Sequence, residues 1–106
     1  MYIRIVTFAL TVGHEDYLAL TEQVAPAFAA WPGLQAKYWI ADEAANEYGG
    51  VYVFDSKEAA DASRETELFH GLAANPAFAD LRVVEYDVLA APTAATAVVP
   101  LTTTVA

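Results

Sequence analysis

Four segments of the chain have the apolar pattern of β-strands, and two have the three-and-four spacing of amphipathic helices. The strands are predicted over residues 2–10, 34–42, 48–54 and 81–89. A first helix is predicted over residues 14–31, where Glu15 and Asp16 favour a helix start. A second helix is predicted from Asp55 to Asn75. The predicted order of elements is therefore β-α-β-β-α-β.

Prolines and a capping pattern set the expected ends of these helices. Pro26 lies inside the first helix and is expected to kink it, or to end its regular part near Ala25. Asp55, with Glu58 three residues later, resembles a helix cap. We expect residues 1–90 to form one domain. The uncharged tail, residues 91–106, is not expected to be a helix, and is either a frayed end or an arm laid over a partner.

The element order is that of the ferredoxin-like α+β fold, with a four-stranded antiparallel sheet and both helices on one face. The other face of the sheet is then left bare. The first, third and fourth predicted strands are apolar on both faces, and 57% of all residues are hydrophobic. A bare apolar sheet favours association, so we expect a homodimer in which a second sheet covers the first.

Charge and cysteine content narrow the possible partners. The formal net charge is −9, which would repel the phosphates of nucleic acids and anionic lipid headgroups. No cysteine is present, which excludes disulfides and thiolate metal sites. No stretch approaches the length of a membrane helix, and no signal peptide is recognised. We therefore expect a cytoplasmic protein that binds neither nucleic acid nor membrane, with no metal and no cofactor.

One region of the sequence resembles a known family. Residues 32–54 combine three short motifs at fixed spacing, namely Pro32-Gly33, Lys37-x-Trp39 and Gly49-Gly50-x-Tyr52-x-Phe54. This segment is similar to the core signature of the YdhR-like monooxygenases of the dimeric α+β-barrel superfamily, which also includes the antibiotic-biosynthesis monooxygenases. The resemblance implies a dimer whose two sheets form a barrel and an apolar pocket between helices and sheet in each subunit. Some members of the superfamily oxidise phenols with molecular oxygen and no cofactor.

The candidate catalytic residues are Trp39, Asn46 and His70. The indole of Trp39 can stack on a substrate and donate one N–H, whereas the alternative is a core tryptophan. Asn46 lies near the place where the quinone-forming relatives have a substrate-polarising amide, but asparagine is also common in hairpin loops. His70 could accept a proton, or could be a structural histidine.

Four further residues are expected to bind the substrate. Phe28 and Phe69 come from the two predicted helices, and Arg64 could anchor an anion or form a surface ion pair. Strand alternation places Lys37 and Gln35 on the same face as Trp39 and places Tyr38 on the opposite face.

From these observations we predict a small, cofactor-independent monooxygenase that acts on an aromatic or polyketide-like phenol. Two alternatives stay open: a non-catalytic dimeric protein that binds an apolar aromatic small molecule, and a polyketide cyclase or isomerase.

Overall fold

The computed structural model describes residues 1–99, which form four strands and four helices. Their order is β1 (Tyr2–Leu10), α1 (His14–Ala29), β2 (Leu34–Asp42), β3 (Glu47–Phe54), α2 (Lys57–Ser63), α3 (Glu67–Ala74), β4 (Phe78–Asp87) and α4 (Ala90–Thr96).

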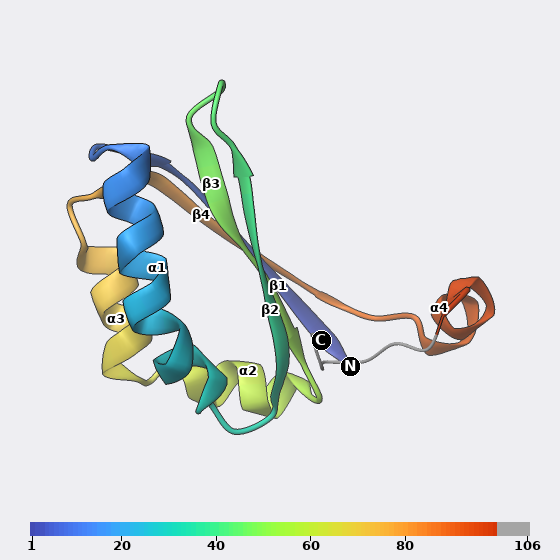
Figure 1. The fold of residues 1–106 in the computed structure, drawn as a ribbon. Coiled ribbons are helices and arrows are strands. Elements are labelled where there is room, and N and C mark those ends of the chain that lie inside the picture. The colour runs from blue at the N-terminus through green and yellow to red at the C-terminus, as the bar shows by residue number, and fades with distance from the viewer. Residues whose placement is uncertain (100–106) are drawn as a thin grey trace.

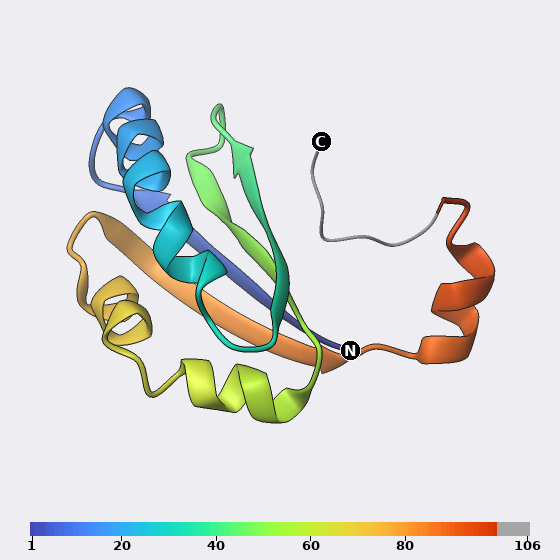
Figure 2. The same ribbon diagram turned by 60° about the horizontal axis from the view of Figure 1, so that its bottom comes forward.

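The four strands form one antiparallel sheet in the order β2-β3-β1-β4. The helices α1, α2 and α3 all lie on one face of this sheet (Figure 1, Figure 2). The predicted ferredoxin-like α+β fold is thus confirmed. β1 and β3 are the inner strands, and β2 is an edge strand whose far side has no neighbour within the described residues.

The alternation of β1 divides its side chains between the two faces of the sheet. Its even-numbered residues are buried under the helices, and its odd-numbered residues are partly exposed on the other face. The core beneath the helices is mainly aromatic, and its buried members are Tyr2, Val6, Phe8, Leu10, Tyr17, Phe28, Trp31, Tyr48, Tyr52, Phe54 and Ala60. Aromatic side chains bury much area each, which gives a small domain a substantial core.

The predicted second helix is two helices in the structure. Ser56, and not Asp55, caps α2 by accepting a hydrogen bond from the backbone amide of Ala59. Thr66 caps α3 in the same way through the amide of Phe69. A side-chain oxygen that satisfies a free amide favours a helix start at that point. The cap at Thr66 therefore begins a new helix inside the predicted one.

Two proline-based predictions are wrong, namely that the regular part of the first helix could end near Ala25 and that the tail is not a helix. α1 includes Pro26 and continues to Ala29, with the Pro26 carbonyl accepting a hydrogen bond from the Ala30 amide. The tail was not expected to be helical, yet α4 includes Pro92 at its third residue. In the first helical turn an amide has no partner inside the helix, so proline is tolerated there. Residues 100–106 of the predicted tail lie outside the described residues.

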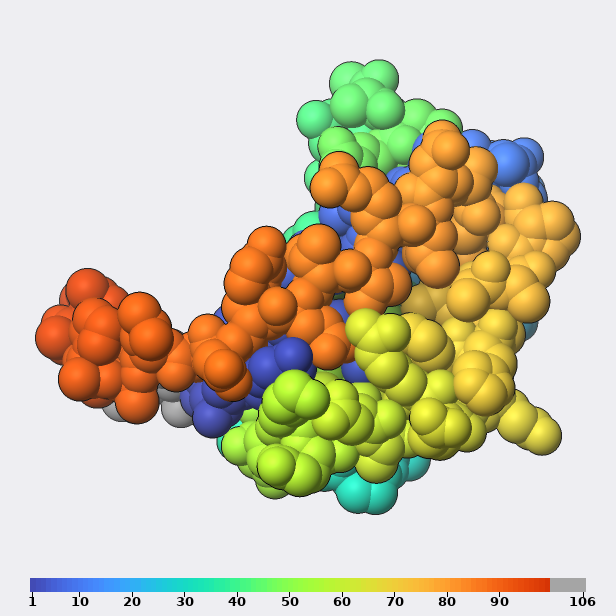
Figure 3. All heavy atoms as spheres, turned by 180° about the vertical axis from the view of Figure 1, so that it is seen from behind, coloured from blue at the N-terminus to red at the C-terminus, as the bar shows by residue number. Residues whose placement is uncertain are grey.

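α4 projects from the body of the molecule (Figure 3). It follows β4 on the side of the sheet opposite to α1 (Figure 1). Across residues 1–99, no helix is both long enough and apolar enough to span a membrane.

Candidate functional site

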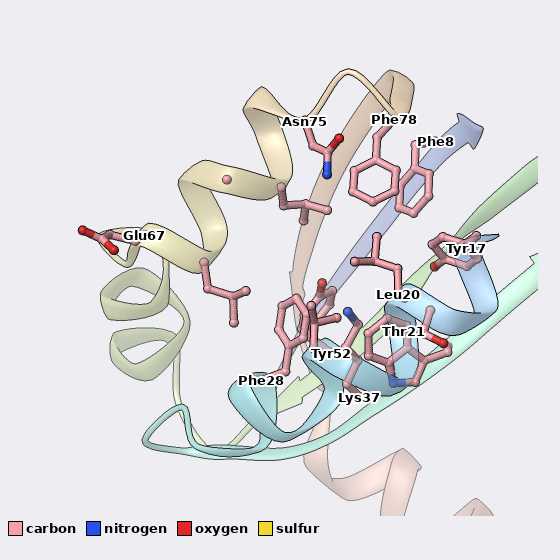
Figure 4. A pocket seen from close by; sticks show the side chains of 17 residues that line it. Phe8, Tyr17, Leu20, Thr21, Phe28, Lys37, Tyr52, Glu67, Asn75 and Phe78 are labelled. Carbon is pink, nitrogen blue, oxygen red and sulfur yellow. The ribbon is translucent and has the colours of Figure 1, made fainter. Parts of the chain in front are cut away.

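A cavity of about 250 Å³ lies between the helix-facing side of the sheet and the helices α1 and α3 (Figure 4). Most of its wall is apolar or aromatic. The lining residues are Phe8, Tyr17, Leu20, Thr21, Val24, Phe28, Lys37, Trp39, Gly49, Gly50, Tyr52, Glu67, Leu68, Gly71, Leu72, Asn75 and Phe78. Small-molecule sites have this character, a concave apolar wall with few polar groups.

The amine of Lys37 is held among three aromatic rings at one side of the cavity. Its Nζ atom lies 3.4 Å from the centre of the Trp39 ring, 3.5 Å from that of Phe28 and 4.7 Å from that of Tyr52. The register of β2 and β3 explains this, because Lys37 pairs with Tyr52 and Trp39 pairs with Gly50. Phe28 approaches from α1. Ring faces attract a cation, so this cage can hold an ammonium group.

Burial lowers the pKa of Lys37 from 10.5 to about 7. Among the described residues, the Lys37 amine forms neither an ion pair nor a hydrogen bond with another side chain. A lysine without a carboxylate partner loses water on burial and gains no opposite charge, so its neutral form is favoured. Near neutral pH this amine can therefore both accept and donate a proton.

The tyrosines of the cavity wall cannot serve as bases near neutral pH. Burial raises the pKa of Tyr17 to about 12. Burial also raises the pKa of Tyr52, although the nearby charge of Arg4 opposes that effect. Both hydroxyls stay protonated, and Glu67 is an exposed carboxylate on the first turn of α3. Lys37 is thus the lining group best suited to proton exchange.

The adjacent glycines of β3 have different steric roles. A Cβ atom on Gly50 would lie 2.8 Å from Cε of Lys37, so the absence of a side chain at Gly50 leaves room for the lysine stem. A Cβ atom on Gly49 would collide with the backbone of Val6 in β1. Gly50 therefore allows the position of Lys37, and Gly49 allows the close approach of two strands.

A buried ion network lies beside the cavity. The guanidinium of Arg4 is fully buried and donates to Glu85 Oε2 at 2.6 Å, to Ser63 Oγ at 2.9 Å and to the Ala60 carbonyl at 2.8 Å. Arg64 donates to the same Glu85 oxygen at 2.8 Å. Burial raises the pKa of Glu85, but hydrogen bonds and charges from the two arginines outweigh it and hold the pKa below its ordinary value.

Of the predicted site residues, the structure brings Trp39, Lys37 and Phe28 together. Trp39 is 36% exposed, so a ligand can reach its ring, and it contacts Phe28 edge-to-face at 5.6 Å. Arg64 is paired with Glu85, and the ring of Phe69 packs under the guanidinium of Arg4 at 5.0 Å. Neither Arg64 nor Phe69 lines the cavity.

Asn46 and His70 also lie outside the cavity wall. The amide of Asn46 forms two hydrogen bonds with the backbone of Leu10, at 3.2 Å and 3.1 Å, and its φ angle is 52°. It therefore fixes the β2–β3 hairpin loop against the end of β1. His70 is exposed on α3.

Gln35 does not share the face of Trp39, which corrects the expectation from strand alternation. The register between β2 and β3 shifts between Leu34 and Ala36, which marks a bulge. Beyond such a bulge the alternation of faces changes by one residue. Gln35 consequently lines a groove on the outer side of the sheet, together with Ala36 and Tyr38.

Sequence reasoning missed Arg4 and Asn75. The signal for Arg4 was present, because it is a single basic residue in an apolar strand at a position that alternation assigns to the core. Asn75 was interpreted only as the end of a helix, and nothing in the sequence indicates that its side chain lines a cavity. The described residues contain no group of three or more metal-ligating side chains.

Comparisons with known proteins place the chain in a family. The sequence model of the family described as "Putative mono-oxygenase ydhR" matches residues 3–99. No curated protein sequence matches this chain.

Several solved structures share the fold at low sequence identity. A variant of SnoaB, a cofactor-independent oxygenase from Streptomyces nogalater, has a TM-score of 0.69 and 14% identity, over 83% of this chain and 92% of that one. The heme-degrader MhuD from Mycobacterium tuberculosis, with two hemes bound in its active site, has a TM-score of 0.66 and 20% identity. The match covers 84% of this chain and 96% of that one. A dimeric ferredoxin-like protein of unknown function from Thermobifida fusca has a TM-score of 0.65 and 20% identity. The match covers 83% of this chain and 92% of that one. At these identities the likeness informs the fold alone, and the oxygenase and the heme-degrader show that one fold carries different chemistry.

Proposed function

Because the chain belongs to the family described as "Putative mono-oxygenase ydhR", we propose that it is a cofactor-independent monooxygenase that oxidises an aromatic phenol in the cavity around Lys37. One observation carries this proposal: the amine of Lys37, with its pKa lowered to about 7, lies in an aromatic cage at the wall of an apolar cavity. A phenol offers an aromatic ring to that wall and an acidic proton to that amine.

The size of the cavity supports a substrate of about two fused rings. An apolar cavity of roughly 150 Å³ accommodates one benzene molecule. The cavity here measures about 250 Å³ and is partly open to solvent, so a third ring can extend out of it. The partly exposed face of Trp39 offers a surface on which such rings can stack.

In the proposed reaction the substrate supplies all the electrons. Lys37 Nζ takes the phenolic proton, and the phenolate transfers one electron to dioxygen. The phenoxyl radical and superoxide then combine, which forms a bond from oxygen to an ortho or para ring carbon that carries a hydrogen. The ammonium returns its proton to the outer peroxide oxygen.

The second half of the reaction breaks the O–O bond. Loss of the remaining hydrogen from that ring carbon, as a proton to the Lys37 amine, forms a carbonyl and expels hydroxide, which leaves as water. One oxygen atom enters the product, the other becomes water, and both lost hydrogens are in that water. The aromatic faces beside Lys37 would stabilise its ammonium between the two transfers.

We also propose that the protein is a homodimer in which a second copy covers the outer face of the sheet. Register places Ile3 and Tyr86 opposite each other there, and Tyr38 and Tyr86 are 51% and 58% exposed. Such a broad apolar face rarely stays bare in solution. We expect Tyr86→Arg to shift sedimentation toward the monomer at micromolar concentration. Leu18→Arg, on the exposed side of α1, is the control that should stay dimeric; a wild-type monomer would refute this part.

Oxygen uptake tests the proposed activity. Purified protein, without added flavin, haem or metal, is given a panel of anthrones and naphthols. We expect uptake above the uncatalysed rate for at least one of them. If ligands bind and no member of the panel is oxidised, the non-catalytic alternative replaces the enzyme. If a ligand is instead cyclised or isomerised without oxygen uptake, the cyclase or isomerase alternative holds.

Haemin belongs in the binding assay as a control, because one solved structure of this fold is of a heme-degrader. The residues here do not fit histidine ligation in the cavity. Nδ1 of His14 lies 2.7 Å from the Tyr48 hydroxyl, and His70 is exposed on α3. We therefore expect haemin to show no spectrum of histidine coordination with this protein.

A further inference from the structure

Asn75 contributes an amide to the cavity wall. It follows the last residue of α3, and the next residue, Pro76, has no N–H group. Its Oδ1 atom accepts a hydrogen bond from the Ala77 amide at 2.9 Å. This is an Asx turn, in which the side chain of asparagine replaces a backbone carbonyl.

The turn determines which way the amide points. A backbone N–H can only donate, so the Asn75 atom that faces Ala77 must be the oxygen. The nitrogen Nδ2 is therefore directed away from the turn, and in Figure 4 it points toward the side chains of the cavity. Within residues 1–99, Nδ2 donates no hydrogen bond to the protein. Asn75 thus offers a donor in a fixed orientation.

Another polar lining residue is already engaged within the protein. The hydroxyl of Thr21 donates to the carbonyl of Leu18 at 2.7 Å. Asn75 sits at the end of α3, whereas Lys37 comes from β2, so the two approach the cavity from different layers of the fold (Figure 4). A ligand that fills the cavity can contact both.

We propose that Asn75 is a specificity-determining residue whose Nδ2 donates a hydrogen bond to a carbonyl oxygen of the substrate. The cavity would then select fused-ring phenols with two polar ends, a hydroxyl for Lys37 and a carbonyl for Asn75. The phenol end rests on the proposed function, and the carbonyl end rests on Asn75 alone. In the free protein Nδ2 reaches solvent, because no buried side-chain nitrogen or oxygen among the described residues lacks a partner. A ligand that covers Nδ2 without offering an acceptor would leave it unpaired, so a ligand with a carbonyl at that place is favoured by about one hydrogen bond.

A matched pair of ligands tests this selectivity without any turnover. One is a hydroxytetralone with its hydroxyl and its carbonyl at opposite ends of the fused rings. The other is the tetrahydronaphthol of the same skeleton, which lacks only the carbonyl. We expect the wild type to bind the hydroxytetralone about five to ten times more tightly, the value of one neutral hydrogen bond.

Asn75→Asp separates the donor from the turn. The aspartate keeps an oxygen for the Ala77 amide, so the turn should persist, but it replaces the donor with a second acceptor. We expect this variant to lose the preference for the hydroxytetralone and to bind the tetrahydronaphthol as before. Asn75→Ala, which removes both atoms, should lose the same preference, and its circular dichroism reports whether the fold survives.

Each outcome decides one point. The role of Asn75 would be overturned if the wild type bound the two ligands with equal affinity. It would also be overturned if a folded Asn75→Asp variant lost affinity for both ligands to the same extent. Lys37→Met should weaken both ligands. If it weakens neither while the Asn75 preference remains, recognition of the phenol by Lys37 fails and the assignment of Asn75 stands.

Discussion

The Nζ atom of Lys37 lies 3.4 Å from the centre of the Trp39 ring, and both residues project from the helix-facing side of β2. The ring of Trp39, with those of Phe28 and Tyr52, surrounds the amine and helps to keep it from water. One pair of residues on one strand thus combines a proton acceptor with a stacking surface. The chemistry that we propose depends on this pair.

The first prediction concerns the pH dependence of turnover. A base must be neutral to accept a proton, and the pKa of Lys37 is about 7. Activity should therefore rise with pH through about 7 and then level off, after subtraction of the uncatalysed rate. Lys37→Met should lower activity by roughly a hundredfold or more. Lys37→Arg keeps a cation that does not deprotonate, so it should not restore the rising limb. A wild-type profile in Lys37→Arg would exclude Lys37 as the base.

The second prediction concerns stability. In the folded chain the pKa of Lys37 is about 7, whereas its ordinary value is 10.5. Between these values the unfolded chain binds a proton that the folded chain does not, so this group makes the free energy of unfolding rise with pH across that window. Lys37→Met should remove this rise and should stabilise the protein most below about pH 7, where the wild type buries an ammonium.

Urea unfolding at fixed protein concentration measures this effect. Lys57→Met is the control, because Lys57 is exposed and a hydrogen bond from its ammonium to Asp61 raises its pKa. The Lys57→Met variant should keep the rise of the free energy of unfolding with pH. A Lys37→Met protein with an unchanged dependence on pH would show that burial does not shift the Lys37 pKa as described.

The sequence predicted the strands better than the site, for a physical reason. Alternation of apolar residues is a local signal, so β1 and β2 were predicted with their observed bounds. The same alternation, with the spacing of the Lys37-x-Trp39 motif, put Lys37 and Trp39 on one face. The bulge that moves Gln35 depends on pairing with a distant strand, and no local pattern indicates it.

Asn46 and Asn75 show where residue type alone fails. Both are asparagines at the end of an element, and each offers the same amide. The amide of Asn46 is used by the backbone of Leu10, thirty-six residues away in sequence. That of Asn75 is only half used by Ala77. The Asn46 contact is long-range in sequence, and the position of the Asn75 amide at the cavity depends on how α3 packs on the sheet, so neither role is visible before the chain folds.

The third prediction concerns Gly50. In Gly50→Ala the new Cβ would lie 2.8 Å from Cε of Lys37, so the lysine stem must move out of its cage. We expect weaker binding of phenols with little loss of stability, because Cε lies near the flexible end of the lysine stem and can shift at small cost. Gly13→Ala is the control, because Gly13 lies outside the cavity wall and a Cβ there would meet only Asp16 Oδ2, at an ordinary contact distance of 3.5 Å. It should keep phenol binding and lose about 1 kcal/mol or less. Unchanged phenol affinity in Gly50→Ala would argue against the cage as the binding site.

The fourth prediction concerns the buried ion network. Glu85→Ala leaves the fully buried guanidinium of Arg4 without its anion and should cost about 3–5 kcal/mol in chemical denaturation. Asp61→Ala, which breaks the exposed pair with Lys57, should cost far less. The pKa of Glu85 is lowered in the folded state, so its stabilisation is present above its ordinary pKa and is lost as pH falls through the lowered one. Equal costs for the two variants would show that Arg4 does not depend on Glu85.

The most direct test of the account is isotopic labelling of the product, with Lys37→Met as the comparison. Metal-free protein is incubated with an anthrone-type phenol under heavy-isotope dioxygen, and the product is analysed by mass spectrometry. The account predicts that the wild type places one labelled oxygen atom in each product molecule. It also predicts that Lys37→Met forms product no faster than the uncatalysed reaction, although the variant is folded and still binds aromatic analogues that carry no oxygen atom. Unlabelled product, or equal rates for the wild type and Lys37→Met, would contradict it.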